Sequence, residues 1–153
     1  MTSSRPNKYG KINRDKVVGF TWNNKQYFGY EGDTLASALL ANDIKIIARS
    51  FKYHRPRGVM SCGIEESGAL VTIGSDSKTD PNVRATTQEI YPGLIAKGQN
   101  AFPSVNFDFA GVNNYLSRFF SAGFYYKTFM GLPPFEWGKG TGCLLYTSDA
   151  ADE

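Results

Sequence analysis

Two β-prone runs close to the N-terminus, separated by two asparagines, constrain the fold more than any other feature. Residues 17–22 and 25–30 are rich in valine, threonine and aromatic side chains, which favour extended strands. Asn23 and Asn24 lie between them, and asparagine adopts positive φ more readily than other non-glycine residues. We therefore expect a β-hairpin with a two-residue turn. The facing pairs in that register are Phe20 with Tyr27 and Val17 with Tyr30.

A short helix should follow the hairpin. Asp33 and Thr34 are alternative N-caps, because both side chains can accept a hydrogen bond from the first helical turn. Asn42 is a suitable left-handed C-cap. Apolar residues recur at helical spacing between the caps, so one face of the helix should be buried. The residues on this face are Leu35, Ala38 and Leu39.

Further β-prone runs occupy residues 44–48, 69–73 and 83–90. The order of hairpin, helix and further strands indicates an α+β fold, specifically a β-grasp domain of the ubiquitin-like or [2Fe-2S] ferredoxin-like type. We place this domain at residues 15–100, after a flexible N-terminus at residues 1–14.

A cluster of positive charge follows the expected third strand. The chain has a net charge of +3, but residues 44–64 contain five lysines and arginines and no acidic residue. Pro56 and Gly58 should keep the loop at residues 53–58 out of regular structure. Such a cluster can bind phosphate, a cofactor or an acidic partner, and the alternative is a solvated loop. The candidate cofactor-binding residues, which lie in what we call the basic loop (residues 49–58), are Arg49, Lys52, His54, Arg55 and Arg57.

The cysteines argue against a metal centre. Cys62 occupies the position where a β-grasp ferredoxin carries its cluster loop, and the second cysteine, Cys143, is distant. A plant-type [2Fe-2S] site uses the spacing C-x4-C-x2-C with a fourth cysteine further on. Counted from Cys62, that spacing falls on Ser67 and Leu70, and the fourth ligand would lie near residues 84–87, where no cysteine occurs. We predict a ferredoxin-type scaffold without a cluster or any other metal, in which Cys62 is a small packing residue.

No residue pattern in the chain predicts a catalytic site. His54 is the only histidine and has no nucleophile or second metal ligand at a suitable spacing. Glu65 and Glu66 are adjacent rather than opposed, and no nucleotide-binding glycine motif occurs. The chain has no apolar run long enough for a membrane helix, and its first sixteen residues carry no secretory signal. A cytoplasmic location is therefore expected.

The composition changes beyond the predicted domain. Between Tyr115 and Trp137, nine aromatic side chains occur in 23 positions without a helical or strand period. We interpret residues 101–141 as an extended connector whose rings pack on surfaces supplied by other domains, with a separate small core as the alternative. Residues 142–153 resemble a translated sequencing adapter, with a genuine acidic tail as the alternative. On the adapter interpretation, the natural chain continues beyond this point.

Four stretches resemble a known protein family. They are residues 30–41 (YEGDTLASALLA), 49–58 (RSFKYHRPRG), 81–87 (PNVRATT) and 122–130 (AGFYYKTFM). Together they are similar to the N-terminus of the alpha subunits of heterotetrameric sarcosine oxidases, over residues 15–137. The missing cluster cysteines agree with this resemblance. Related cyanide synthase and opine dehydrogenase subunits keep those cysteines, whereas the sarcosine oxidase alpha subunits do not.

This resemblance implies a role in the oxidative demethylation of sarcosine to glycine. In such enzymes a hydride passes to FAD on the beta subunit, electrons move to FMN at the alpha–beta interface, and oxygen becomes hydrogen peroxide. The one-carbon unit passes to tetrahydrofolate on the alpha subunit, which also binds NAD in a region that follows the connector. The implied partners are the remaining alpha-subunit domains and the beta, gamma and delta subunits. No cofactor residue carries over, because those positions lie beyond Trp137.

The segment itself is therefore expected to be an inactive N-terminal scaffold, holding no cofactor and contacting neither nucleic acid nor membrane. The alternative is a stand-alone β-grasp module that uses the basic loop to bind RNA or an acidic protein, because aromatic and cationic side chains mix in residues 49–53. Genes for the other subunits beside this one would favour the scaffold. The amine substrate, sarcosine or another N-methyl amine, stays open.

Overall fold

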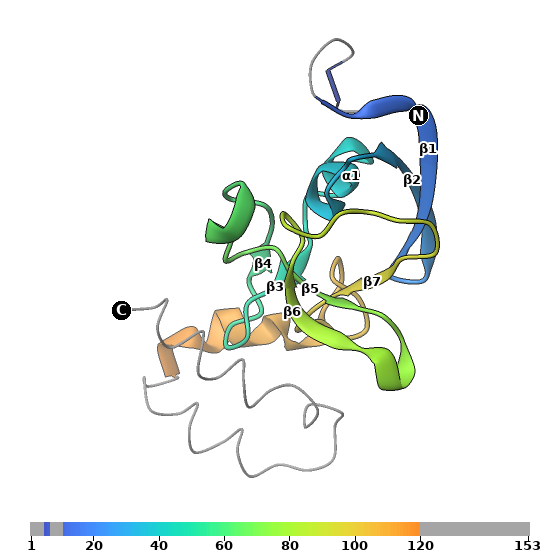
Figure 1. The fold of residues 1–153 in the computed structure, drawn as a ribbon. Helices are drawn as coiled ribbons and strands as arrows, with labels where there is room; N and C mark the ends of the chain where they lie inside the picture. Colours follow the sequence, from blue (N-terminus) through green and yellow to red (C-terminus); the bar gives the residue numbers. More distant parts are fainter. Residues whose placement is uncertain (1–4, 7–10, 120–153) are drawn as a thin grey trace. The chain divides into compact units, whose positions relative to one another are not determined.

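The computed structural model describes residues 5–6 and 11–119 (Figure 1). The chain divides into two compact units, Met1–Asn114 and Tyr115–Glu153, and nearly all the described residues belong to the first. The aromatic stretch beyond Phe119, the adapter-like residues 142–153 and much of the predicted flexible N-terminus lie outside the described residues. The elements are β1 (Asn13–Trp22), β2 (Lys25–Glu31), α1 (Leu35–Ala41), β3 (Ala48–Arg49), β4 (Pro56–Arg57), β5 (Leu70–Ile73), β6 (Asp80–Arg84), β7 (Ile95–Gly98) and the 3-10 helices η1 (Gly63–Glu65), η2 (Asp76–Lys78) and η3 (Phe109–Phe119).

The predicted hairpin is confirmed in both register and turn. β1 and β2 pair antiparallel, and the facing pairs include Phe20 with Tyr27 and Val17 with Tyr30. Asn23 and Asn24 form the turn with φ values of 46° and 64°. This left-handed conformation at both central residues matches the right-handed twist of the strands. The Asn23 side chain also accepts a hydrogen bond from the Gly98 N–H at 3.0 Å, which ties the turn to β7.

The helix begins and ends as predicted, with Asn42 as its C-cap, but the left-handed residue comes one position later than predicted. Thr34 is the N-cap, and its Oγ1 accepts a hydrogen bond from the Ser37 N–H. Asn42 is not left-handed, since its φ is −90°; the left-handed residue is Asp43, with a φ of 61°. The reason is that the Asn42 side chain donates to the carbonyls of Ala38 and of Phe28 in β2. Asn42 thus completes the helix while its amide links α1 to the hairpin, and the chain reverses at Asp43.

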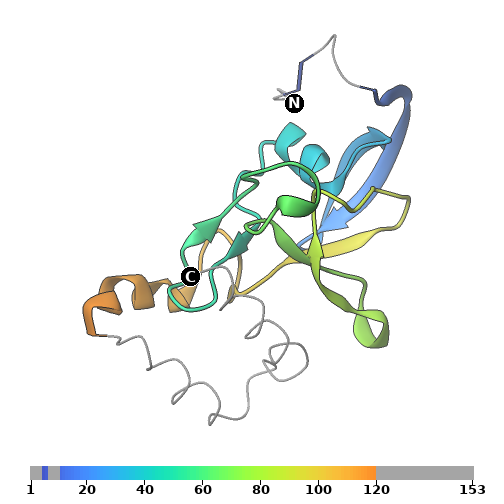
Figure 2. The ribbon, with the colours of Figure 1, turned by 60° about the vertical axis from the view of Figure 1, so that its left-hand side comes forward.

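The five-stranded sheet has the order β2-β1-β7-β5-β6. β1 and β7 are parallel neighbours, and the other neighbouring pairs are antiparallel. A parallel pair needs a long crossover, and the chain between β1 and β7 supplies it, with α1 beside the hairpin (Figure 2). The mixed sheet with one helix is consistent with the predicted β-grasp arrangement.

Two predicted strands are misplaced. Within residues 44–48 only Ala48 enters a strand, the two-residue β3. The strand predicted at residues 83–90 is instead β6, which begins at Asp80 and ends at Arg84 because the chain then turns, with the Thr87 N–H donating to the Arg84 carbonyl. The central strand β7 was not predicted, because four residues of mixed polarity carry too little pattern.

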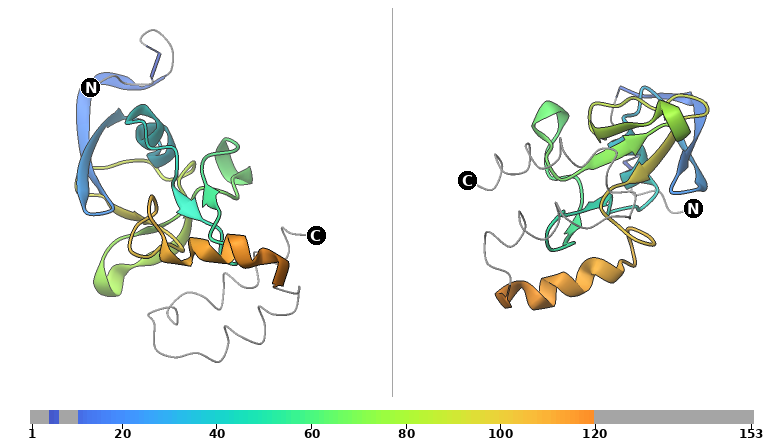
Figure 3. Two further views of the ribbon diagram at one scale, coloured as in Figure 1. Left: turned by 180° about the vertical axis from the view of Figure 1, so that it is seen from behind. Right: turned by 90° about the horizontal axis from the view of Figure 1, so that it is seen from below.

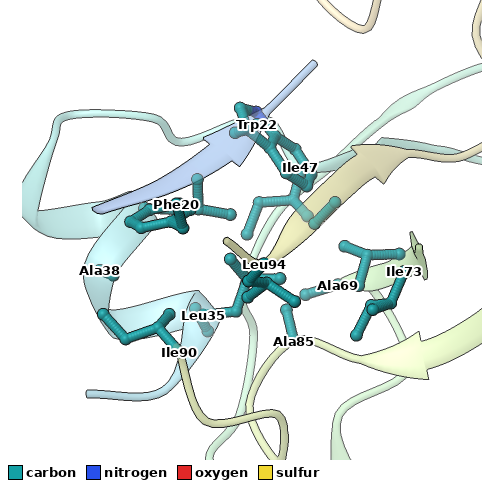
Figure 4. Close-up of a cluster of buried hydrophobic side chains, with 14 of the residues drawn as sticks. Phe20, Trp22, Leu35, Ala38, Ile47, Ala69, Ile73, Ala85, Ile90 and Leu94 are labelled. Carbon is teal, nitrogen blue, oxygen red and sulfur yellow. The ribbon is translucent and has the colours of Figure 1, made fainter. Parts of the chain in front are cut away.

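The core lies between α1 and the sheet (Figure 4). Phe20 and Trp22 enter it from β1, Leu35 from α1 and Leu94 from the segment before β7. All of these side chains are buried. Helix and sheet thus bury their apolar faces against each other, which is the main source of stability in such a layered domain.

The basic loop is more regular than predicted. Pro56 and Arg57 form β4, which pairs antiparallel with β3 in a separate two-stranded sheet. Proline is tolerated there because β4 is an edge strand and its missing N–H is not needed. The short sheet shares no strand pairing with the five-stranded sheet (Figure 3), but the Arg49 N–H donates to the Gln99 carbonyl just after β7. In the described ranges, no helix is long and apolar enough to span a bilayer.

Candidate functional site

The loop that contains Cys62 corresponds to the loop that holds the cluster in a β-grasp ferredoxin. Cys62 is exposed, so the prediction that it is a packing residue is wrong. Ser67, at the next ligand spacing, is also exposed, and Leu70 begins β5. Within residues 5–6 and 11–119 there is no group of three or more histidine, cysteine or acidic residues that could hold a metal ion.

Glu66 organises this loop, which we call the Glu66 loop (residues 60–69). Its side chain is 1% exposed, although glutamate is rarely buried without partners. One carboxylate oxygen accepts hydrogen bonds from the N–H groups of Met60 and Ser61, at 2.7 and 2.8 Å. The other accepts from the N–H groups of Gly68 and Ala69, at 2.5 and 3.1 Å. One carboxylate therefore joins the two ends of the loop.

The electrostatics of Glu66 follow from these contacts. Burial raises the pKa of the carboxyl group because it disfavours the charged form, but the four backbone N–H donors act in the opposite direction and prevail. The net pKa is lowered from its ordinary value. Glu66 is therefore an anion at neutral pH, stabilised by backbone dipoles.

The Glu66 loop is also fixed to the segment after β6, where a fourth cluster ligand would have been expected. Thr86 Oγ1 donates to the Gly63 carbonyl at 2.6 Å, and Arg84 Nε donates to the Glu66 carbonyl at 3.2 Å. Hydrogen bonds thus close the loop on this segment.

The five predicted basic-loop residues fall into two groups. Arg49 and His54 point inward, and both contact residues 105–108. The Arg49 guanidinium donates to the carbonyls of Val105, His54 and Asn106, at 2.8, 2.9 and 3.2 Å. Its side chain is 13% exposed. Arg49 therefore links the backbone at His54 to the backbone at residues 105 and 106.

His54 is buried against an acid that sequence reasoning missed. Its Nδ1 lies 2.6 Å from Asp108 Oδ2, and the exposed fractions of the two side chains are 3% and 0%. The other Asp108 oxygen accepts from the N–H groups of Phe102 and Ala110, at 3.1 and 3.2 Å. Arg49 Nε lies 3.9 Å from the same carboxylate as His54. We call Arg49, His54 and Asp108 the buried clamp.

Lys52, Arg55 and Arg57 form the second group. Lys52 and Arg55 both contact the ring of Tyr53, with the Lys52 Nζ at 5.1 Å and the Arg55 Cζ at 4.7 Å from its centroid. Arg55 Nε also donates to the Asn114 side chain at 2.8 Å. Arg57 lies half-buried in β4. These three cations are the part of the predicted site that is available to an anionic partner. Cofactor binding by them stays a prediction.

A cluster of phenylalanines follows the clamp in sequence. Phe102, Phe107 and Phe109 are 65%, 62% and 60% exposed. Their rings nevertheless contact one another, with centroids 6.4 Å apart for Phe102 and Phe109 and 5.3 Å apart for Phe107 and Phe109. Asp108 lies within this phenylalanine patch in sequence and anchors its backbone. Such an exposed apolar patch is typical of a protein–protein interface.

The chain is similar to known proteins over most of its length. It is 51% identical over 139 residues to the sarcosine oxidase subunit alpha of Rhizobium meliloti strain 1021, which is 91% of this chain and 14% of that protein. It is 40% identical over 89 residues to the sarcosine oxidase subunit alpha of Corynebacterium sp. strain U-96, which is 56% of this chain and 9% of that protein. The predicted resemblance is confirmed, and the chain spans a minor part of the length of these relatives.

A solved structure is also similar, that of the L-proline dehydrogenase from P. horikoshii. The TM-score is 0.48 at 24% identity, and the match covers 63% of this chain and 18% of that one. Residues 15–101 match the family described as a 2Fe-2S iron-sulfur cluster binding domain, and these are the residues that fold into the sheet, the helix and the Glu66 loop. The chain therefore belongs to the family of 2Fe-2S iron-sulfur cluster binding domains.

Proposed function

We propose that this chain is the N-terminal scaffold segment of a sarcosine oxidase alpha subunit. The observation that carries the proposal is the 51% identity to such a subunit over 91% of the chain. The whole enzyme would oxidise sarcosine to glycine, reduce oxygen to hydrogen peroxide and pass the one-carbon unit to tetrahydrofolate. FAD, FMN, NAD and tetrahydrofolate would be held outside this segment, which on its own would be inactive. A cytoplasmic location is part of the proposal.

The scaffold would differ from its family in holding no cluster. A [2Fe-2S] centre needs four protein ligands, usually thiolates. Here Cys62 is followed at the ligand spacing by Ser67 and Leu70, neither of which supplies a thiolate. The N–H groups of the surrounding loop are directed at Glu66 instead. The residues present do not fit the cluster, so we assign no electron transfer to this domain.

The partners would be the remaining domains of the alpha subunit and the beta, gamma and delta subunits. The phenylalanine patch supports such an interface, because three rings that remain about 60% exposed are costly in water. Lys52, Arg55 and Arg57 would face carboxylates of those domains or phosphates of a bound cofactor. Arg49 and His54 are excluded from this role, since the buried clamp already holds them.

The alternative of a stand-alone module that binds RNA or an acidic protein through the basic loop has no support from the relatives, which are sarcosine oxidase alpha subunits. Base stacking needs an accessible aromatic face beside cations. The Tyr53 ring is already contacted by Lys52 and Arg55, and His54 is buried. We therefore do not retain it.

The decisive experiment uses the full-length reading frame expressed together with the other subunit genes. We expect the purified complex to retain flavin and to produce hydrogen peroxide in a sarcosine-dependent manner. A full-length complex that contains flavin but oxidises no sarcosine or related N-methyl amine would overturn the proposal.

The basic-loop part of the proposal has its own test in that complex. The double substitution Arg55→Ala and Arg57→Ala should weaken assembly or flavin retention. Lys25→Ala, which removes an exposed cation at the hairpin end, is the matched control. Unchanged assembly and flavin content in the double variant would make the basic loop a solvated surface.

A further inference from the structure

We propose that the Glu66 carboxylate replaces the iron–sulfur cluster as the anion around which this loop folds. The inference rests on the proposed absence of a cluster and explains how the domain keeps its loop closed without one. The family that matches residues 15–101 is described as cluster-binding. This chain, however, lacks the cysteines that would ligate the cluster of that family.

A cluster loop is an anion-binding structure. Backbone N–H groups that converge in a concave loop bind phosphates and iron–sulfur centres alike, because both are negatively charged acceptors. Hydrogen bonds to the sulfur atoms are among the main interactions of such a centre with the protein. A loop that loses the cluster keeps these inward-pointing N–H groups, and each one costs free energy if it stays buried without an acceptor.

Glu66 supplies that acceptor from within the loop. Its two oxygens receive four backbone N–H groups, two from residues 60 and 61 on one side and two from residues 68 and 69 on the other. Cys62 and Ser67, the first two positions of the ligand spacing, lie between these two sides and are exposed. The carboxylate thus takes the interior of the loop, and the former ligand positions are displaced to its surface.

The local sequence allows this close approach. A Cβ at Gly68 would lie 2.7 Å from the Gly58 carbonyl oxygen and 3.1 Å from Glu66 Oε1. Glycine at position 68 therefore lets its own N–H reach the carboxylate while the Gly58 backbone packs against it. The lowered pKa of Glu66, in spite of its burial, agrees with an anion that the loop was built to receive.

The loop's link to the segment after β6 completes the replacement. In a cluster protein the fourth ligand would join the two segments through iron. Here the Thr86 hydroxyl and the Arg84 guanidinium join them through hydrogen bonds to the carbonyls of Gly63 and Glu66. An anionic acceptor for the loop N–H groups and a crosslink between the two segments, the two structural contributions of a cluster, are thus both supplied by side chains.

The test compares Glu66→Gln and Glu66→Asp with Glu65→Gln in the 153-residue chain. Glutamine keeps the shape of the side chain but turns one acceptor oxygen into an NH2 donor that faces two N–H donors. Aspartate keeps the charge on a shorter side chain. Glu65 is the neighbouring exposed carboxylate and is the matched control.

We expect Glu66→Gln to lower the unfolding midpoint by about 5–15 °C and to accelerate hydrogen exchange at the amides of residues 60, 61, 68 and 69. Glu65→Gln should change neither quantity. Glu66→Asp should fall between the two. A Glu66→Gln chain that fails to fold, with a folded Glu65→Gln chain, also supports the inference. Wild-type stability and exchange in Glu66→Gln would overturn it.

The pH dependence of unfolding provides a second readout. Because the folded-state pKa of Glu66 is lowered, its stabilising contribution is present above the unfolded-state value of 4.5 and is lost as pH falls through the folded value. Glu66→Gln should remove this part of the acid destabilisation, whereas Glu65→Gln should retain it.

Failure of this inference can be distinguished from failure of the proposed function. Stoichiometric iron and sulfide in the wild-type chain would contradict the cluster-free scaffold. An iron-free chain whose stability does not respond to Glu66→Gln would contradict only the replacement by Glu66.

Discussion

The buried clamp makes the substitution Asp108→Ala the most informative test of the fold. The Asp108 side chain is fully buried, and its Oδ2 lies 2.6 Å from His54 Nδ1 and 3.9 Å from Arg49 Nε. It also accepts two backbone N–H groups, those of Phe102 and Ala110. Alanine would remove the acceptor of the two backbone N–H groups and the buried anion beside His54 and Arg49.

The size of the stability loss depends on the contacts that Arg49 and His54 keep in the variant. Removing one partner of a buried charge pair costs about 3–5 kcal/mol, because the other charge is left buried without compensation. Arg49 keeps its three carbonyl acceptors, so the lower end of that range applies. We expect a loss of about 3 kcal/mol in the free energy of unfolding.

Urea unfolding followed by tryptophan fluorescence measures this loss, because Trp22 is buried in the core and reports on its exposure. Asp15→Ala, which removes an exposed carboxylate in β1, is the control and should have almost no effect. A loss below about 1 kcal/mol for Asp108→Ala would contradict this expectation, because the buried clamp would then contribute no more than an exposed ion pair does.

Three further outcomes are expected. Thr34→Ala removes the N-cap hydroxyl of α1 and should cost about 1 kcal/mol in the free energy of unfolding, measured by urea denaturation. Gly98→Ala places a Cβ against the Ile47 carbonyl oxygen, closer than real Cβ atoms approach, so it should cost about 2 kcal/mol or more by the same assay. An unchanged midpoint would mean that β7 and Ile47 lie further apart. Lys16→Met should raise the pKa of Glu31, because the Lys16 hydrogen bond is the largest cause that lowers it, and an NMR titration that finds no change would contradict the contact.

The hairpin and the start of the helix could be predicted because their signals are local. Asn23 and Asn24 fix the turn through their own backbone preference, and the turn fixes the register of both strands. Thr34 caps the helix through a bond to a residue three positions away. The left-handed residue after the helix was misplaced by one position, from Asn42 to Asp43, because the Asn42 side chain bonds to Phe28, a contact that depends on how α1 packs on β2.

The site was harder to predict because its partners are distant in sequence. His54 and Asp108 are 54 residues apart, and Arg49 bonds to carbonyls 56 and 57 residues away. Viewed along the chain, Arg49 and His54 belong to a uniformly basic run with no acid beside them, so they were grouped with the cations that do face solvent. Asp108 stands among phenylalanines and gives no local signal of burial.

Glu66 was missed for a different reason. Next to Glu65 it resembles half of an exposed acidic pair, and only the folded loop separates the buried carboxylate from the exposed one. The usable signal was the glycine at position 68 together with short side chains nearby, which permit backbone N–H groups to converge on an anion.

Anaerobic reconstitution of the 153-residue chain with iron and sulfide tests whether this domain keeps a ferredoxin-like fold without a cluster. Bound iron, acid-labile sulfide, visible absorption and the thermal unfolding midpoint would be measured before and after treatment. We expect a cooperatively folded chain, no [2Fe-2S] absorption bands and an unchanged midpoint. Iron and sulfide bound in the stoichiometry of a [2Fe-2S] centre, with a raised midpoint, would contradict it.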